Sequence, residues 1–295
     1  MDHGRQVICR FFYLLVVACS LAACTHTTGA VGGGANVVLR VKDGERISYG
    51  RLAEELQGVD LVFIGENHDN VAHHATQLRI IDELHWRETP LAIGLEMFPA
   101  KAQPELDAWL SGRLSDTVFK SLYGKTWRMP WDLYGAIFQR ARTWRIPLIG
   151  INIPQWVVKK VFRSGFASLT PEERQELPSD VTCQIDPNYR KFIRRSFGTH
   201  AGNGGEFEHF CEAQMLWTKG MAHHLTKYLD SRPGRQVVVL TGASHALRQG
   251  IPEQIAQESR YTNRIVLPEL NDLTRKTVTT GEADYLILDP TLADL

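Results

Sequence analysis

The sequence predicts an α/β fold built on an open, mostly parallel sheet, with helices on both faces in a three-layer arrangement. Two observations support this prediction. Short runs of valine, isoleucine and leucine without polar alternation are typical of parallel strands that are buried on both faces. Segments with apolar residues at helical spacing separate these runs, and such alternation is typical of a sheet covered by helices on its two sides.

The chain begins with a pattern typical of exported proteins. Arg5 and Arg10 form a basic start, and an uncharged apolar run follows over residues 11–18. This run is too short to cross a bilayer, which needs roughly 20 apolar residues, so it is typical of a secretory signal. Leu21-Ala22-Ala23 then precede Cys24, an order that resembles the lipobox of bacterial lipoproteins. A plain signal peptide with an incidental cysteine is the alternative interpretation.

The lipobox interpretation predicts where the protein resides. It implies a signal peptide over residues 1–23, acylation of Cys24 by fatty acids such as palmitate, and a place in the cell envelope on a lipid anchor in the outer membrane. Thr25, rather than Asp, follows the cysteine. The resemblance to bacterial lipoproteins implies that a lipoprotein with this residue is sorted to the outer membrane. Residues 24–36 are rich in glycine and threonine, so we expect a flexible tether there.

Composition limits the partners of the remaining domain, which we expect over residues 37–295. Lysine plus arginine equals aspartate plus glutamate at 33 each, so no net charge favours nucleic acid or another polyanion. Once the signal is removed and Cys24 is acylated, Cys183 and Cys211 remain. They could pair in an oxidising compartment or stay as two buried thiols, and their spacing decides neither.

The expected strands and helices follow one another in a regular order up to about residue 154. Strands are expected over residues 60–65, 91–96, 147–152, 236–242 and 285–288, and helices over residues 73–86, 104–110, 134–144 and 207–228. The stretch at about 155–205 breaks this order, because it holds several prolines and helical patterns but no convincing strand. We therefore expect a small helical insertion there, placed as a lid over the sheet.

Polar side chains gather where the expected strands end. Residues 65–68 and residues 242–245 both read Gly-x-x-His, and each motif directly follows a strand. Ligands of open α/β sheets bind beyond the carboxyl ends of the strands. A single motif of this kind more often holds a structural histidine, but its repetition at matching positions favours a functional one. We therefore expect convergence in one crevice of Glu66, His68, Glu96 and His245.

Further segments accompany the two motifs. They are Phe63-Ile64-Gly65-Glu66-Asn67-His68-Asp69-Asn70 with His73-His74 and Gln77, Gly94-Leu95-Glu96-Met97-Phe98, Gly150-Ile151-Asn152-Ile153-Pro154, Gln214-Met215-Leu216-Trp217, and Gly242-Ala243-Ser244-His245. In combination, these segments resemble the ChaN family of haem-binding lipoproteins, from about Val38 to Pro290. The wider clan resembles the Tiki and TraB proteins and the erythromycin esterases, which share a first Gly-x-x-His, an acidic residue and a later histidine.

The resemblance implies two functions of different classes. The first is haem binding, as a carrier or receptor accessory in iron and haem uptake, with an outer-membrane haem receptor system as partner and a homodimer as an assembly. The second is a metal-dependent hydrolase, with catalytic roles for Glu66, His68, Glu96 and His245. In the hydrolase, the ligands of a divalent metal would be His68, His245 and Glu96, since imidazoles and carboxylates suit zinc, manganese or iron.

Haem iron needs an axial ligand, and the sequence suggests Tyr189. This residue lies in the expected insertion and precedes Arg190 and Arg194, which would contact the haem propionates. A nearby cation would lower the pKa of the tyrosine and favour the phenolate that ferric iron binds. An exposed basic helix with a packed tyrosine is the alternative, and we expect this group to be separate from the strand-end crevice. The other candidate ligands are Tyr134, His209 and His224.

Overall fold

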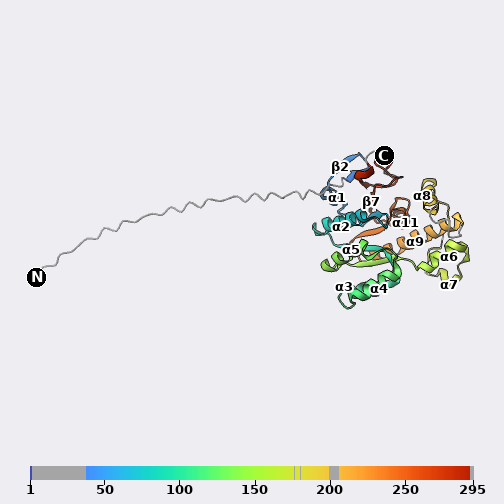
Figure 1. Ribbon diagram of the computed structural model, residues 1–295, viewed down its shortest axis with the longest axis horizontal. Helices are drawn as coiled ribbons and strands as arrows, with labels where there is room; N and C mark the ends of the chain where they lie inside the picture. The colour runs from blue at the N-terminus through green and yellow to red at the C-terminus, as the bar shows by residue number, and fades with distance from the viewer. Residues whose placement is uncertain (2–37, 176, 180, 199–205, 293–295) are drawn as a thin grey trace. The chain divides into compact units, whose positions relative to one another are not determined.

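The computed structural model describes Met1 and residues 38–292, except 176, 180 and 199–205 (Figure 1). The predicted signal peptide, Cys24 and the tether lie outside the described residues, so lipid anchoring and outer-membrane localisation stay predictions. In the described part of the chain, no helix is both long and apolar enough to cross a membrane. Every element described below belongs to one unit, residues 36–295.

An eight-stranded sheet forms the centre of this unit, in the order β2-β1-β8-β7-β3-β6-β4-β5. The strands are β1 Val38–Arg40, β2 Glu45–Ile47, β3 Leu61–Glu66, β4 Leu91–Pro99, β5 Leu148–Asn152, β6 Gln236–Gly242, β7 Asn263–Pro268 and β8 Tyr285–Ile287. Strands β3 to β8 pair in parallel, while β1 pairs antiparallel with β2 and β8. The predicted α/β fold with a mostly parallel sheet is confirmed.

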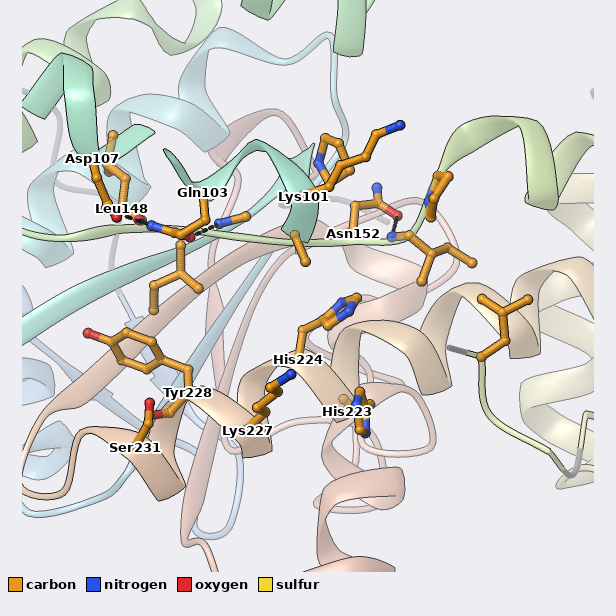
Figure 2. Close-up of a pocket in the computed structure, with 18 of the residues that line it drawn as sticks. Lys101, Gln103, Asp107, Leu148, Asn152, His223, His224, Lys227, Tyr228 and Ser231 are labelled. Carbon is orange, nitrogen blue, oxygen red and sulfur yellow. Dashed lines mark hydrogen bonds between the residues drawn. The ribbon is translucent and has the colours of Figure 1, made fainter. Parts of the chain in front are cut away.

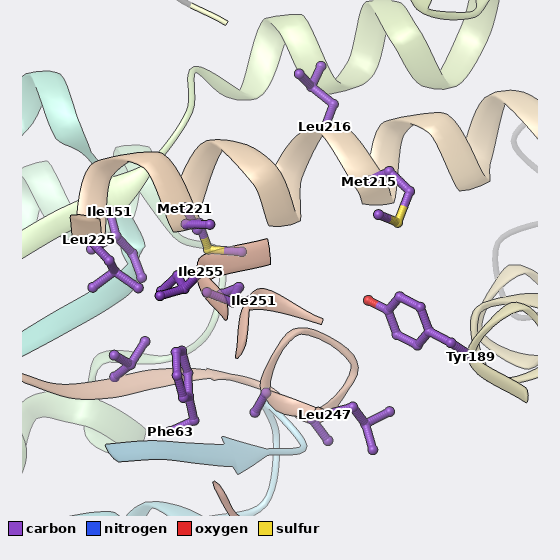
Figure 3. Close-up of a cluster of buried hydrophobic side chains, with 14 of the residues drawn as sticks. Phe63, Ile151, Tyr189, Met215, Leu216, Met221, Leu225, Leu247, Ile251 and Ile255 are labelled. Atoms are coloured by element: carbon purple, nitrogen blue, oxygen red, sulfur yellow. The ribbon is translucent and has the colours of Figure 1, made fainter. Parts of the chain in front are cut away.

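Helices cover both faces of this sheet. They are α1 Tyr49–Leu56, α2 Val71–His85, α3 Gln103–Leu110, α4 Asp116–Thr126, α5 Trp131–Trp144, α6 Gln155–Ser164, α7 Pro171–Arg174, α8 Pro187–Gly198, α9 Phe207–Ser231, α10 Ala243–Ala246 and α11 Ile251–Glu258, with short 3-10 helices η1 Ala100–Ala102, η2 Phe166–Ser168 and η4 Pro290–Leu292. Successive strand residues point to opposite sides. Val62 and Ile64 of β3 therefore belong to the core under α1 to α5, whereas Phe63 belongs to the core on the other face, which residues of α6, α8, α9 and α11 share (Figure 3).

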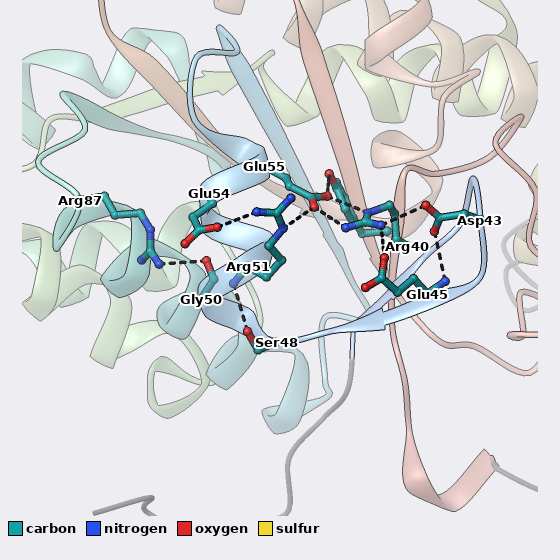
Figure 4. A network of polar contacts seen from close by, with 10 residues as sticks. Arg40, Asp43, Glu45, Ser48, Gly50, Arg51, Glu54, Glu55 and Arg87 are labelled. Carbon is teal, nitrogen blue, oxygen red and sulfur yellow. Dashed lines mark hydrogen bonds and ion pairs between the residues drawn. The ribbon is translucent and has the colours of Figure 1, made fainter. Parts of the chain in front are cut away.

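Ion pairs around Arg40 join the β1–β2 hairpin to α1 (Figure 4). Arg40 is 8% exposed, and its guanidinium lies 2.9 Å from Glu55 of α1 and 3.0 Å from Asp43. Glu45 contacts the same group at 2.5 Å, and Arg51 reaches Glu55 at 2.9 Å. The two strands contribute only three residues each, so this charge network supplements a small apolar contact.

Between β5 and β6 the described residues form helices and no strand. Cys183, which precedes α8, forms a disulfide with Cys211 of α9, and their Cα atoms lie 5.5 Å apart. Of the two alternatives left open for these thiols, the structure has the pair. Tyr189 and Ile193 of α8 are buried in the core that α9 shares. The boundaries of an insertion at 155–205 and its role as a lid stay predictions.

Candidate functional site

The two Gly-x-x-His motifs start on neighbouring strands. β3 pairs in parallel with β6, and Glu66 lies opposite Gly242 at the carboxyl ends. The chain is closely packed at Gly65, where an added Cβ would lie 2.5 Å from Leu267 Cδ2 and 3.2 Å from the backbone of Ala243. Any side chain at Gly65 would therefore push against the second motif. The pairing brings both motif loops to one edge of the sheet, where α/β proteins bind ligands.

Glu66 is an ionised carboxylate surrounded by hydrogen-bond donors. It is 2% exposed, and it accepts bonds from His68 Nδ1 at 2.8 Å, from Gln77 Nε2 at 2.6 Å and from the Tyr134 hydroxyl. His74 Nδ1 lies 3.2 Å from the same carboxylate. Burial raises the pKa of Glu66, but the hydrogen bonds and charges of the two histidines outweigh burial and lower that pKa to about 2. Glu66 therefore stays negative at neutral pH.

Helix α2 supplies two of these donors because of where it begins. The Asn70 side chain caps the helix by accepting from the backbone N–H groups of Ala72 at 2.9 Å and His73 at 3.3 Å. His74 and Gln77 follow in the first turns at i and i+3, so they share one face of the helix. That face lies against the end of β3, which places both side chains on Glu66.

His68 directs one ring nitrogen toward Glu66 and the other toward Gly242 of the second motif. Its Nε2 lies beside Gly242, where an added Cβ would be 3.0 Å away. The side chain is 32% exposed, and Trp127 packs edge-on against the ring with centroids 4.9 Å apart. Burial lowers the pKa of His68, but the hydrogen bond to Glu66 and the charge of Glu96 outweigh burial and raise it. His68 is thus the solvent-accessible member of a buried network.

Glu96 and His245 complete the group at the strand ends. Glu96 Oε2 accepts the backbone N–H of Gly242 at 2.7 Å, and its Oε1 lies 3.8 Å from His245 Nε2. Thr218 Oγ1 lies 2.9 Å from His245 Nδ1. Burial lowers the pKa of His245, which favours a neutral imidazole. The structure therefore brings the four predicted residues together, with Glu96 between the two motif histidines.

This arrangement is one of hydrogen bonds rather than metal ligands. Glu66 is already surrounded by donors, and His245 Nδ1 faces a threonine hydroxyl. Among the residues that the structure describes, no group of three or more histidine, cysteine, aspartate or glutamate side chains is placed to hold a metal ion. The predicted metal set of His68, His245 and Glu96 thus gains no support from the geometry.

Tyr189, the predicted haem ligand, lies in the core. It is 3% exposed, and its hydroxyl donates to the carbonyl oxygen of Ser244 at 3.1 Å, next to His245 (Figure 3). Burial raises the pKa of Tyr189, so the expected lowering by nearby cations is wrong. The expected separation from the strand-end crevice is also wrong, because this hydrogen bond joins α8 to the second motif loop. Packing over the sheet outweighs the local charge pattern.

The two arginines expected at the propionates have other contacts in the structure. Arg190 donates to the carbonyl oxygen of Cys183 at 2.8 Å and pairs with Glu208. The Arg194 guanidinium lies 3.7 Å from the ring centroid of Phe207, which also packs against Arg190. Both side chains therefore tie α8 to α9 across the disulfide region.

The three other candidate ligands have different surroundings. The Tyr134 hydroxyl is bonded to Glu66, and His209 packs against Gly165, where an added Cβ would lie 2.9 Å from its ring. His224 lies on α9, and its Nδ1 is 2.7 Å from the carbonyl oxygen of Ile151. It also lines a large groove. His224 is therefore the candidate that combines a fixed ring with a binding surface.

This groove, with a volume of about 1800 Å³, runs along the free edge of β5, the last strand of the sheet (Figure 2). Its walls come from η1, α3 and α9, with further residues from α6, α7 and α11. Gln103 covers the strand edge by donating to Leu148 O at 2.8 Å and accepting from Gly150 N at 3.1 Å. One face of α9 lines the groove through side chains at helical spacing. They include His224, Lys227, Tyr228 and Ser231, and Lys219, Ala222 and His223 of the same helix also line the groove.

Comparison with known sequences places the chain in a family. A family model described as haem-binding uptake, Tiki superfamily, ChaN matches residues 52–255. Protein RETICULATA-RELATED 5, chloroplastic, of Arabidopsis thaliana is 24% identical over 257 residues. That match covers 80% of this chain and 35% of the relative, so the chain spans about a third of the relative's length.

One solved structure shares the fold. ChaN of Campylobacter jejuni, solved with cofacially bound haem, gives a TM-score of 0.66 at 18% identity, over 85% of this chain and 95% of that chain. An erythromycin esterase EreC mutant gives a TM-score of 0.47 at 11% identity, over 75% and 72% of the two chains. Because the family model spans more than half of the sequence, the chain belongs to the ChaN family of haem-binding uptake proteins in the Tiki superfamily.

Proposed function

We propose that this protein binds haem in the groove along β5 and acts in haem or iron uptake. Family membership supports the ligand, and the C. jejuni relative of the same fold binds haem. The observation that carries the choice of site is the contact between His224 and Ile151 on the groove wall. The distinction between a carrier and a receptor accessory depends on partners outside this chain.

The contact with Ile151 determines the chemistry of the His224 ring. A carbonyl oxygen can only accept, so Nδ1 is the donor in this 2.7 Å hydrogen bond. The lone pair of the imidazole is then on Nε2. Histidines that ligate metals almost always donate their other ring nitrogen to a carbonyl or carboxylate, which fixes the ring and raises its basicity. His224 meets this condition on the wall of the groove (Figure 2).

The groove also has the mixed walls that a porphyrin needs. Apolar side chains for the ring come from Leu148 and Ile153 at the sheet edge and from Trp156 of α6, which is 50% exposed. Cationic side chains include Lys101 of η1 and Lys227, one turn after His224. Haem sites combine an apolar slot, an axial ligand and cations for the propionates. The lining residues fit this requirement.

Substitution of the ligand tests the proposal directly. In a haemin titration of the full chain followed by absorbance, wild type should saturate at a defined stoichiometry with a shifted Soret band. His224→Ala should abolish that shift and weaken binding by at least about a hundredfold, because even outer-shell losses cost roughly 10- to 100-fold in metal affinity. His85→Ala on α2 is the matched control, since it removes a histidine that does not line the groove.

Tyr189→Phe belongs in the same titration. It keeps the buried ring and removes only the hydroxyl, so haemin binding should be unchanged if the groove holds the haem. Loss of the shifted band in Tyr189→Phe, with a normal spectrum in His224→Ala, would assign the ligand to Tyr189 and refute the groove site. The absence of saturable binding in wild type would refute haem binding itself.

A second candidate function is hydrolysis at the strand-end crevice. The observation that favours it is the Glu66–His68 pair, in which a buried carboxylate holds Nδ1 and leaves Nε2 beside Gly242 on a side chain that is 32% exposed. A carboxylate in this position orients an imidazole and stabilises its protonated form, as in hydrolytic triads. His68 could therefore act as general base toward a water beside Glu96.

The hydrolase candidate predicts a pH profile as well as a residue. Turnover of a p-nitrophenyl ester should fall by roughly 10²- to 10⁴-fold in His68→Ala, while His85→Ala at the far end of α2 should match wild type. The base must be unprotonated, and the pKa of His68 is raised above its usual 6.5. The rate should therefore rise with pH through an inflection above 6.5. Equal turnover in wild type and His68→Ala would rule this function out.

A further inference from the structure

Three arginines gather at the end of the groove where β5 begins. Arg145 directly follows α5 in a left-handed conformation with φ of 54°, Arg232 directly follows α9, and Arg235 directly precedes β6. All three line the groove together with Pro147 and Leu148. Arg145 lies about 90 residues before Arg232 and Arg235 in the chain. No local sequence pattern therefore predicts the cluster.

The charges of these arginines are not balanced by ion pairs. Arg232 donates to the carbonyl oxygen of Ser231 and Arg235 to that of Leu91, each at 3.1 Å, and both acceptors are neutral. Within the described ranges, none of the three arginines forms a salt bridge. Arg142 on the same rim differs, because it pairs with Asp116.

Of the carboxylates that line the groove, Asp107 is the one whose charge acts on Tyr228 beside the arginines. Asp107 of α3 accepts from Gln103 Nε2 at 2.9 Å, and its charge raises the pKa of the half-buried Tyr228 while Arg235 and Arg232 lower it. Burial is the largest cause and raises that pKa overall. The three arginines therefore outnumber Asp107 at this end of the groove, which makes it positive. Of the other lining carboxylates, Glu172 and Glu173 belong to α7 and Glu258 lines a second pocket with Lys227. The planar donor fork of arginine matches the geometry of a carboxylate.

The position of this cluster relative to His224 sets the size of the ligand. Arg232 follows His224 by eight positions, which corresponds to about 12 Å along a helix. Lys227 and Tyr228 lie between them on the groove-lining face of α9 (Figure 2). A flat ligand centred at His224 would thus extend its acidic substituents to the arginines. The walls between them are apolar at Leu148 and Ala222.

We infer that Arg145, Arg232 and Arg235 bind the two propionates of the porphyrin, so that the groove selects dicarboxylate porphyrins and orients them with the acidic edge toward the start of β5. This inference rests on the proposed haem site, and it adds a recognition element that acts without iron. Iron-free protoporphyrin should therefore bind, and a ligand without free carboxylates should bind poorly. Because Arg145 and Arg232 are exposed and Arg235 is partly exposed, binding should also weaken with salt.

The test compares three probes with the full chain: haemin, protoporphyrin IX and protoporphyrin IX dimethyl ester, with binding followed by absorbance and fluorescence. The ester should bind wild type at least about tenfold more weakly than the free acid. Arg145→Gln, Arg232→Gln and Arg235→Gln should each weaken binding of the free acid about threefold, and the triple variant about twentyfold, as exposed ion pairs are worth up to about 1 kcal/mol. None of these changes should affect binding of the ester.

Arg46→Gln on β2, at the opposite end of the sheet, is the matched control and should leave all three affinities unchanged. Equal binding of acid and ester to wild type, with haemin binding still dependent on His224, would overturn the arginine site and leave the haem site standing. An affinity for the free acid that is unchanged in the triple variant would also overturn the arginine site and leave the haem site standing. Failure of wild type to bind haemin or protoporphyrin at all would overturn both proposals.

Discussion

Glu66→Gln should destabilise the protein by about 3 kcal/mol at neutral pH, which is among the largest effects expected of a single substitution. Glu66 is 2% exposed and receives hydrogen bonds from a histidine, a glutamine and a tyrosine, with a second histidine at 3.2 Å. An uncharged amide removes the charge that balances His68 and His74. Its NH₂ group also places donors against donors. Urea unfolding of the variant and wild type measures this loss.

The same substitution should change how stability depends on pH. The pKa of Glu66 is lowered from 4.5 to about 2 in the folded protein. A carboxylate with a depressed pKa contributes stability that is complete above about pH 4.5 and is lost as the pH falls toward 2. That contribution is absent from Glu66→Gln, so the stability gap to wild type should narrow in this window. Glu105→Gln, an exposed change on α3, is the control. A gap that stays constant with pH would contradict the ionised state of Glu66.

Removal of the disulfide should also cost about 3 kcal/mol. Cys183 and Cys211 are 28 residues apart, and a cross-link that closes a loop of this order stabilises by roughly 3 kcal/mol, mainly by restricting the unfolded chain. Cys183→Ser and Cys211→Ser should therefore each have a lower melting temperature than oxidised wild type, and the two decreases should be similar. The ion pair of Arg190 with Glu208 should loosen in these variants, since it joins the same two segments as the disulfide.

Reductant provides the matched comparison for the disulfide. Wild type treated with dithiothreitol should melt like the untreated serine variants, and the variants themselves should not respond to the reagent. A serine variant that melts with oxidised wild type would mean that packing of α8 on α9 is sufficient without the bond. Haemin affinity should not change in either variant, because neither cysteine lines the groove.

Much of the fold could be predicted from the sequence because local patterns encode it. The runs that form β3, β4, β5, β6 and β8 are buried on both faces, so each appears as uninterrupted apolar residues, and the observed bounds differ from the predicted ones by three residues at most. β1, β2 and β7 were not predicted. The first two have three residues each, and pairing within the sheet rather than a sequence pattern makes them strands.

The candidate sites divide in the same way. The sequence by itself determined that two Gly-x-x-His motifs follow buried strands, and parallel sheets bring such ends together, so Glu66, His68, Glu96 and His245 were found. Only the tertiary structure decided which side chains they contact. In the structure, the Tyr134 hydroxyl donates to Glu66, and the buried Tyr189 donates to the carbonyl oxygen of Ser244. Residues of η1, α3 and α9 form much of the groove. Hydrophobic periodicity depends on neighbours a few residues away, whereas a hydrogen-bond partner or a groove wall depends on packing among segments far apart in the chain.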